Sequence, residues 1–345
     1  MAATSRKRAR TEPAPPPADK PKVFNDAVLG HVELHPCCVA VVDTPQFQRL
    51  RGLKQLGPTE YVYPAAGHTR FAHSLGVSFL AGKLVEKLSH QVSPLLHITE
   101  REILCVKLAG LCHDLGHGPL SHTFEKFVRM RRPSLTWRHE HASAALFAKV
   151  VRDEKVAAVF GRYDLTEDDV HFVQELIFGD KSDAPQGWEW RGLPAKNHFL
   201  FEIVSNHRNG IDVDKFDYFR RDAFHLNIPC SFDSDRLIMC ARAIPDDRGV
   251  FTVAYPEKEV WNVYELFRTR FNLHKRAYQH RVSNAIERML CDVLLRAEEA
   301  GFTYRGRRLS EAMDCREAYA TLTDSVFDVI DFLAVEDASL RPAAE

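Results

Sequence analysis

Four side chains that bind metals or carry protons lie within ten residues of one another in the middle of the sequence. The segment 108–122 contains all of them: His113, Asp114, His117 and His122. Imidazole nitrogens and carboxylate oxygens are common ligands of Zn²⁺ and other transition metals. Imidazoles also gain and lose protons near neutral pH. We therefore take this segment as the centre of a candidate catalytic or metal site.

A largely apolar segment leads into these residues. Residues 103–112 predict a buried helix, and Thr99 followed by Glu102 predicts a capping box at its start. Gly116 and Pro119 are expected to end it. His113 and His117 would share one face if the helix continued between them. Ligating groups at the end of a buried helix are unfavourable unless something binds them.

Three interpretations of this segment compete. It could be a solvated, histidine-rich turn. It could also resemble the His-Glu-x-x-His helix of metalloproteases, although that motif needs an uninterrupted helix. In the third interpretation, a phosphohydrolase binds a metal through the adjacent His113 and Asp114 together with one distant His and one distant Asp. This interpretation predicts both partners elsewhere in the chain.

Candidates for both partners are present. His73 stands near the start of a predicted helix, three residues after Arg70. Asp214 lies in the acidic segment 208–222, and on a helix Asp214, Asp217, Tyr218 and Asp222 fall near one face. Taken alone, that segment could also be a solvated acidic face.

The composition narrows the class of protein. Lys and Arg number 46 against 47 Asp and Glu, so no overall attraction to nucleic acid is expected. The eight cysteines contain no Cys-x-x-Cys pair, which indicates reduced thiols of an intracellular protein. The apolar runs are too short to cross a membrane. The 45% of hydrophobic residues suffices for a sizeable core.

The chain divides into three parts. Residues 1–21 combine the basic cluster Arg6–Arg10 with several prolines, so we expect a disordered leader and nuclear import. Residues 22–335 predict one mainly α-helical domain with a few short strands or hairpins, among them short strands or a hairpin over 23–34 and a hairpin arm over 246–255. Residues 336–345 form a tail. Within the domain, helices are expected over 35–56 and 317–333. A long basic helix is expected from 257 to 300, which could meet phosphate, nucleic acid or a partner helix.

The ordered motifs resemble a known family. They are Asp43-Thr-Pro-Gln-Phe-Gln-Arg-Leu-Arg51, Arg70-Phe-Ala-His73-Ser-Leu-Gly, Cys112-His-Asp-Leu-Gly-His-Gly-Pro, Asn209-Gly-Ile-Asp-Val-Asp-Lys and Arg276-Ala-Tyr-Gln-His280. The His…His-Asp…Asp pattern is that of the HD superfamily, and the five motifs together resemble the sterile-alpha-motif and HD-domain dNTP triphosphohydrolases over residues 22–335. The resemblance implies an all-helical HD fold that converts dNTP and water to deoxynucleoside and inorganic triphosphate.

The chemistry of the residues agrees with this expectation. His73, His113, Asp114 and Asp214 suit Zn or Fe. Such an ion would polarise a phosphoryl oxygen and lower the pKa of bound water. Three histidines are then candidates for proton transfer near neutral pH: His117, His122 and His139. Three residues can bind triphosphate oxygens: Arg70, Lys215 and Tyr218. Mg²⁺ would neutralise the remaining charge of the triphosphate.

The resemblance also implies finer roles. His117 and His139 correspond to an acid–base pair, and Gln55 and Asp222 to contacts of the sugar 3′-hydroxyl. Tyr278 corresponds to a steric gate against a 2′-hydroxyl, with Gln279 beside the base. Leu56 and Arg270 complete the implied substrate contacts.

Regulation by nucleotides and a homotetramer are implied as well. The implied guanine-nucleotide site consists of Lys22, Val23, Asp43, Gln48 and Arg51. The implied second nucleotide site includes Asn25, Arg236, Lys258 and Arg281.

The chain departs from the family pattern at several points. Glu125 stands where the family has Asp after the central Ser-His, one methylene longer but still able to orient a His. An arginine of the second nucleotide site is missing near Tyr255. We expect no sterile-alpha-motif domain before residue 22 and no C-terminal lobe after residue 345.

Three functional hypotheses follow. The first is a nuclear, metal-dependent dNTP triphosphohydrolase activated by GTP and dNTP. The second is a catalytically weak, truncated form that binds single-stranded nucleic acid or full-length partners through its basic surfaces. The third is an HD phosphohydrolase of nucleoside monophosphates or cyclic nucleotides, which Tyr278, Gln279 and the activator-site residues disfavour.

Overall fold

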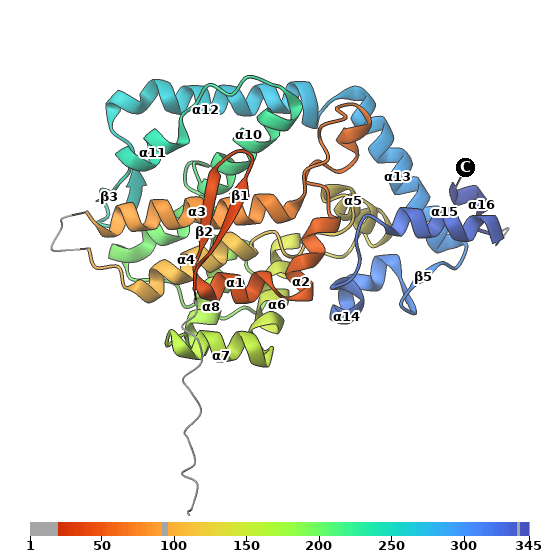
Figure 1. The fold of residues 1–345 in the computed structure, drawn as a ribbon, viewed down its shortest axis with the longest axis horizontal. Helices are drawn as coiled ribbons and strands as arrows, with labels where there is room; N and C mark the ends of the chain where they lie inside the picture. Colours follow the sequence, from red (N-terminus) through yellow and green to blue (C-terminus); the bar gives the residue numbers. More distant parts are fainter. Residues whose placement is uncertain (1–19, 92–95, 337–338, 345) are drawn as a thin grey trace, which may run out of the picture.

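The computed structural model describes residues 20–91, 96–336 and 339–344 as a mainly helical domain with three small hairpins (Figure 1). The helices of the first half are α1 (Pro36–Val42), α2 (Pro45–Gln48), α3 (Arg70–Ser89), α4 (Glu100–Cys112), α5 (His122–Arg131), α6 (His139–Val151), α7 (Glu154–Arg162) and α8 (Glu167–Phe178). Those of the second half are α9 (Phe201–Val204), α10 (Val213–Leu226), α11 (Ser234–Cys240), α12 (Val260–Leu273), α13 (Arg281–Glu299), α14 (Arg316–Tyr319), α15 (Val326–Glu336) and α16 (Arg341–Ala344). The predicted fold class, mainly α-helical with short hairpins, is confirmed.

The strands pair only within their own hairpins. They are β1 (Lys22–Asp26) with β2 (Gly30–Leu34), β3 (Arg242–Pro245) with β4 (Phe251–Ala254), and β5 (Thr303–Tyr304) with β6 (Arg307–Arg308). All three pairs are antiparallel. The first two confirm the hairpins predicted from the sequence. Among the described helices, none combines the length and the apolar character that crossing a bilayer requires.

Helices α3 and α4 form the centre of the core. They pack along each other, α10 and α11 cover α3, and α8 covers α4 (Figure 1). The capping box of Thr99 and Glu102 begins α4 as predicted. Residues 103–106 and 108–112 of α4 are all buried, so the end of this helix delivers the His113-Asp114 pair into the interior.

Several element predictions were wrong in detail. The helix expected over 35–56 is broken into α1, α2 and the 3₁₀ turn Arg49–Gly52. The helix expected from Glu317 to Leu333 is split into α14 and α15. Between them, the Asp324 carboxylate accepts hydrogen bonds from the Lys54 and Leu120 N–H groups at 2.8 and 2.6 Å. Tertiary contacts override the local helical preference in that segment.

The long helix expected over 257–300 is also interrupted. A π-helical turn covers His274–Tyr278, and the chain then changes direction at Gln279 and His280 before α13 begins. In Figure 1, α12 runs along the top edge and α13 descends from its end. Single π-turns are often found at functional sites, and this one carries Tyr278.

The predicted leader, residues 1–21, lies outside the described residues except for exposed Lys20 and Pro21. The predicted tail, 336–345, contains the short helix α16, which packs beside α13 and α15.

We predict that Gly116→Ala destabilises the fold, because a methyl group there would lie 2.3 Å from the His139 carbonyl oxygen and 2.4 Å from the Ser143 nitrogen. Both atoms belong to the α6 backbone, so α6 would have to move. Overpacking of this kind costs about 1–3 kcal/mol, which thermal unfolding would report as a melting temperature several degrees lower. The control is Gly161→Ala in α7, where the added methyl meets nothing within 4 Å. Equal melting temperatures for the two variants would contradict this prediction.

Candidate active site

The end of α4 places the two central histidines in different environments. The helix ends at Cys112, with His113 as its C-cap, so His113 and His117 do not share a helical face. The Nδ1 atom of His113 lies 2.9 Å from the Gly110 carbonyl oxygen. A carbonyl only accepts, so Nδ1 carries the proton and Nε2 presents a lone pair. Among the described residues, that buried Nε2 finds no hydrogen-bond partner.

The four predicted metal ligands converge. His73 comes from the first turn of α3, Asp214 from the first turn of α10, and His113 and Asp114 from the turn after α4. The Asp214 Oδ1 atom lies 3.1 Å from His73 Nε2 and 3.4 Å from His113 Nε2. Asp114 Oδ2 lies 3.4 Å from His73 Nε2. Two imidazoles and two carboxylates thus point at one position, and three of them form a group able to hold a metal ion: His73, His113 and Asp214.

The electrostatics of this cluster favour a bound cation. Burial by itself lowers the pKa of His73, but its hydrogen bonds to the Asp214 and Asp217 carboxylates outweigh burial and raise that pKa to about 10. Burial by itself raises the pKa of Asp214, yet contacts with His113 and His73 bring it well below its usual range. The carboxylates therefore hold a positive charge between them. A divalent ion can supply that charge, and the unpartnered Nε2 of His113 fits it as a ligand.

A further layer of side chains fixes His73. Its Nδ1 atom donates to Asp217 Oδ2 at 2.8 Å, which leaves Nε2 free to act as a ligand. Arg221 holds Asp217 from the other side through Nε at 2.8 Å and Nη2 at 2.9 Å. Arg221 also donates to Asp26 in β1 at 2.8 Å. The N-terminal hairpin thereby supports the candidate metal cluster.

A second cluster adjoins the first. It consists of His117, His122, Glu125 and His139, whose ligand-type atoms all lie within 4.8 Å of one another. His139 Nδ1 lies 2.6 Å from Glu125 Oε1, and the rings of His117 and His139 are stacked with centroids 3.9 Å apart. Asp114 joins the clusters, because its Oδ1 lies 3.2 Å from His117 Nε2.

The stacked histidines have opposite electrostatic environments. Burial, Arg70 and His139 together hold the pKa of His117 well below its usual value. Burial also lowers the pKa of His139, but its hydrogen bond to Glu125 outweighs this and the net shift is upward. The pKa of Glu125 itself is lowered, because the bonds to His122 and His139 outweigh burial. One ring of the stack thus favours the neutral form and the other the protonated form, as in acid–base pairs.

Both clusters open into one cavity of about 630 Å³. Seven of the predicted substrate residues line it: Gln55, Leu56, Arg70, Tyr218, Asp222, Tyr278 and Gln279. His73, Asp114, His117, His122, His139 and Asp214 line it as well. Lys215 and Arg270 lie outside this lining. Lys215 Nζ pairs with Asp212 Oδ2 at 2.9 Å, and Arg270 acts electrostatically on both Lys215 and Tyr218.

Arg70 is already engaged within the protein. Its Nη1 atom pairs with Asp114 Oδ2, and its Nε atom donates to Ser121 Oγ at 2.9 Å. Ser121 has a positive φ of 58°, as does Leu120 with 53°. Residues other than glycine adopt this backbone conformation only where the surroundings impose it, often at functional sites. Arg70 therefore orients the central turn as well as facing the cavity.

Sequence reasoning missed several cavity residues. They are Thr123, Lys126, His274, Ser283, Asn284 and Glu287. The last three were missed because a continuous helix over 257–300 would not turn at Gln279 and bring the start of α13 to the cavity. His68 was missed as well, although it lies two residues before Arg70 in the sequence. It lies 2.8 Å from Asp222 through Nε2.

The residues of the implied guanine-nucleotide site lie on one surface region. Lys22 Nζ lies 3.6 Å from Asp43 Oδ1, and Gln48 accepts from Arg51 Nε at 2.8 Å. Gln48 also donates to the Val42 carbonyl at 2.8 Å, beside Asp43. Val23 is 57% exposed. The residues of the implied second nucleotide site are exposed too. Arg236 pairs at 2.8 Å with Glu259, which follows Lys258 in the sequence. Asn25 lies on β1 and Arg281 begins α13.

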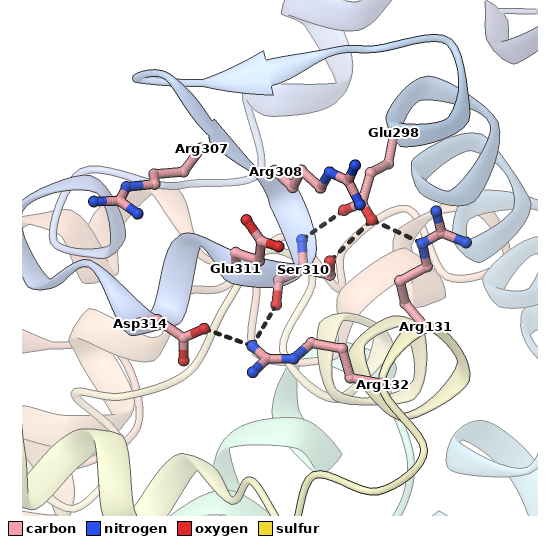
Figure 2. A pocket seen from close by; sticks show the side chains of 8 residues that line it. All are labelled: Arg131, Arg132, Glu298, Arg307, Arg308, Ser310, Glu311 and Asp314. Carbon is pink, nitrogen blue, oxygen red and sulfur yellow. Dashed lines mark hydrogen bonds and ion pairs between the residues drawn. The ribbon is translucent and has the colours of Figure 1, made fainter.

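A smaller cavity of about 360 Å³ lies between α5, α13 and the β5–β6 hairpin (Figure 2). Arg131 Nε donates to Glu298 Oε1 at 2.8 Å, and Glu298 Oε2 accepts from the Ser310 nitrogen at 2.7 Å. Arg132 pairs with Asp314 at 2.6 Å. The first pair joins α5 to α13, and the second joins the end of α5 to the segment after the hairpin. Arg307 and Arg308 are exposed on β6.

Comparison with known proteins agrees with this geometry. Residues 70–221 match the family described as HD domain. This range begins at Arg70 and includes all four predicted metal ligands. This chain is an HD-domain protein. Its match to that family ends before Tyr278, so the π-turn lies outside the matched range.

Curated relatives extend the similarity over most of the chain. The human deoxynucleoside triphosphate triphosphohydrolase SAMHD1 is 46% identical over 335 residues, covering 95% of this chain and 53% of the relative. The zebrafish (Danio rerio) protein of the same name is 46% identical over 318 residues, covering 90% and 51%. A homologue from Dictyostelium discoideum is 38% identical over 310 residues, covering 90% and 55%. The HD-domain chain thus spans about half the length of these relatives.

We predict that Asp217→Asn weakens metal binding about 10- to 100-fold, because a carboxylate behind a ligating imidazole sets its tautomer and basicity. The readout is Zn²⁺ affinity in competition with a chelator, with folding checked by circular dichroism. Asp235→Asn is the control, since Asp235 is an exposed acid that pairs with Lys83 and Arg220 and does not line the cavity. Unchanged Zn²⁺ affinity in Asp217→Asn would show that this carboxylate does not support the site.

Proposed function

We propose that this HD-domain protein hydrolyses dNTPs to deoxynucleosides and inorganic triphosphate. One observation carries the proposal: Asp114 joins a four-residue cluster of metal ligands to a stacked acid–base pair, and both face one cavity. The relatives' printed name, deoxynucleoside triphosphate triphosphohydrolase, supports this choice of reaction.

The metal would be held by His73, His113, Asp114 and Asp214, and we propose Zn or Fe because imidazole and carboxylate ligands suit both. When bound, it would polarise a phosphoryl oxygen and activate water for attack. Arg70, Lys215, Tyr218 and Arg270 would bind the remaining oxygens of the triphosphate, with Mg²⁺ neutralising its charge.

The stacked pair would move the protons. Attack of water at the phosphorus next to the sugar breaks the bond to the 5′-oxygen, which then needs a proton to leave as an alcohol. His139, kept protonated by Glu125, is suited to donate that proton. His117, whose pKa is lowered, is suited to accept one from water. His122 lies on the opposite side of Glu125 and is a second candidate donor.

The sugar would be recognised at the Tyr278 side of the cavity. Tyr278 donates its hydroxyl hydrogen to Asp222 Oδ2 at 2.6 Å, which fixes the phenol ring. A fixed ring beside the sugar leaves no room for a 2′-hydroxyl, whereas Gln55 and Asp222 offer partners for the 3′-hydroxyl. Leu56 and Gln279 line the same cavity and would contact the rest of the nucleoside.

Regulation is a further part of the proposal. GTP would bind at the implied guanine-nucleotide site, which includes Lys22, and a dNTP at the implied second nucleotide site, which includes Arg236. A homotetramer would form around these two sites. The exposed side of α12 supports self-association, because Trp261, Tyr264 and Phe271 are 76%, 59% and 67% exposed. Sedimentation velocity with and without GTP and dATP tests this, and a persistent monomer would contradict it. Nuclear localisation is also proposed, on the basic cluster Arg6–Arg10.

A second candidate function is binding of single-stranded nucleic acid with weak catalysis. Exposed Arg307 and Arg308 beside the smaller cavity favour it, because arginines exposed on a surface can bind phosphates (Figure 2). The two candidates differ in one respect: only the enzyme needs the metal cluster intact.

We predict that Glu125→Gln shifts the alkaline limb of the pH profile of kcat/KM to lower pH by about one unit. The carboxylate raises the pKa of His139, so its loss lowers that pKa, and the proton donor becomes deprotonated at a lower pH. The control is Glu33→Gln on the exposed side of β2. An unmoved alkaline limb would exclude His139 as the proton donor oriented by Glu125.

The proposed function itself predicts that the wild-type chain releases inorganic triphosphate from dGTP, with more product when GTP is added, and that Asp114→Ala releases none. Anion-exchange chromatography of the products measures this directly. If folded, metal-loaded wild type yields no triphosphate with or without GTP, the enzyme proposal fails and the binding function is favoured.

A further inference from the structure

Asp222, the proposed partner of the sugar 3′-hydroxyl, depends on a neighbour for its orientation. Its carboxylate is 1% exposed and has one close partner on each oxygen. Oδ2 accepts from the Tyr278 hydroxyl at 2.6 Å, and Oδ1 lies 2.8 Å from His68 Nε2. A carboxylate buried to this degree needs such donors, because leaving one of its oxygens unpaired is costly.

The contact with Asp222 shows which ring nitrogen of His68 donates. Asp222 Oδ1 accepts, so Nε2 of His68 carries the hydrogen and donates it. Nδ1 is buried and finds no hydrogen-bond partner among the described residues. The imidazole therefore makes a single directed hydrogen bond, and that bond points to Asp222.

The surroundings hold the His68 ring in place. The residue is 8% exposed, and its ring stacks on that of His225 with centroids 4.2 Å apart and an angle of 10° between the planes. The two rings come from the segment before α3 and from the last turn of α10. His68 thus contacts the helix that carries Asp222 at two points.

His68 also fixes the other proposed sugar contact. Its backbone carbonyl accepts a hydrogen bond from the Gln55 nitrogen at 2.9 Å. The neighbouring Lys54 and Thr69 form an isolated antiparallel bridge, which aligns the two segments. One residue therefore orients Gln55 through its backbone and Asp222 through its side chain.

We propose that His68 is the positioning residue for deoxyribose recognition. Its N–H bond directs the Asp222 carboxylate so that the carboxylate can accept from Tyr278 and from the sugar at the same time. Without this bond Asp222 turns, Tyr278 loses its anchor, and the cavity no longer distinguishes deoxyribose from ribose. This inference rests on the proposed dNTP hydrolysis and assigns its sugar specificity to a residue outside the metal and proton-transfer clusters.

The experiment compares His68→Leu, which has no donor, with His68→Gln, whose amide nitrogen can still donate to Asp222. Triphosphate release from dATP and from ATP is measured at a fixed GTP concentration, with kcat and KM obtained separately. We expect His68→Leu to lower kcat/KM for dATP about 10- to 100-fold, the range expected for one hydrogen bond to a charged group. The preference for dATP over ATP should fall as well, while Zn²⁺ content stays at the wild-type level. His68→Gln should keep most of the preference.

A matched control and a second variant keep the test decisive. His90→Leu removes an exposed imidazole at the end of α3 and should leave both substrates unaffected. If His68→Leu does not fold, His68→Asn replaces it, since its shorter side chain is polar but does not reach Asp222. His68→Asn should lose the preference in the same way.

The outcomes separate the two proposals. If wild type releases no triphosphate from dATP, the proposed function fails. If wild type is active and the folded donor-free variant keeps the wild-type preference for dATP over ATP, the positioning role of His68 is wrong. Equal losses in His68→Leu and His68→Gln would also overturn it, because the hydrogen bond would then not be the cause.

Discussion

The buried carboxylate of Asp114 is the constraint on which the rest of the site depends. It faces Arg70 and His73 on one side and His117 on the other. Burial by itself raises its pKa, but Arg70, His113 and His117 bring the pKa well below its usual range, so it stays ionised in the interior. A buried negative charge is tolerated only with such partners. The arrangement of α3, the turn after α4 and the second histidine cluster can therefore be understood as the set of positive and hydrogen-bonding groups that one carboxylate requires.

The turn that carries Asp114 is held from a distant part of the chain. Arg49 is buried and donates to the carbonyl oxygens of Leu115 and His117 at 2.8 and 2.7 Å. The same guanidinium donates to the Leu322 carbonyl at 2.8 Å, and the Tyr319 hydroxyl donates to the Gly116 carbonyl at 2.6 Å. Backbone groups in a buried turn need such partners because no helix or strand satisfies them. The segment around α14 thus belongs to the candidate active site, although its own sequence carries no sign of chemistry.

The histidines of the two clusters differ in their neighbouring partners and not in their residue type. His73, His113, His117 and His139 are all imidazoles within one small region, yet their partners differ: Asp217, the Gly110 carbonyl, Asp114 and Glu125. A carboxylate or carbonyl on Nδ1 leaves Nε2 free as a metal ligand. A carboxylate beside one ring of the stacked pair, and Arg70 near the other, separate their pKa values. Glu125 reaches His139 Nδ1 at 2.6 Å with a side chain one methylene longer than the aspartate expected from the family pattern.

The sequence by itself determined the helical class, the first two hairpins and the residues of the candidate metal cluster. Those depend on signals within a short stretch, such as the capping box at Thr99 and the His-Asp pair after an apolar helix. The tertiary structure decided that His113 and His117 do not share a helical face, because α4 ends at Cys112 and the turn that follows places them in different clusters. The π-turn at Tyr278 and the turn that brings Ser283 to the cavity likewise escaped prediction, since a basic, helix-forming stretch shows no break. His68 escaped prediction for the same reason. Its proposed role depends on Asp222, 154 residues away, and on Gln55 across a backbone bridge. Contacts between distant segments set these features, and local sequence does not encode them.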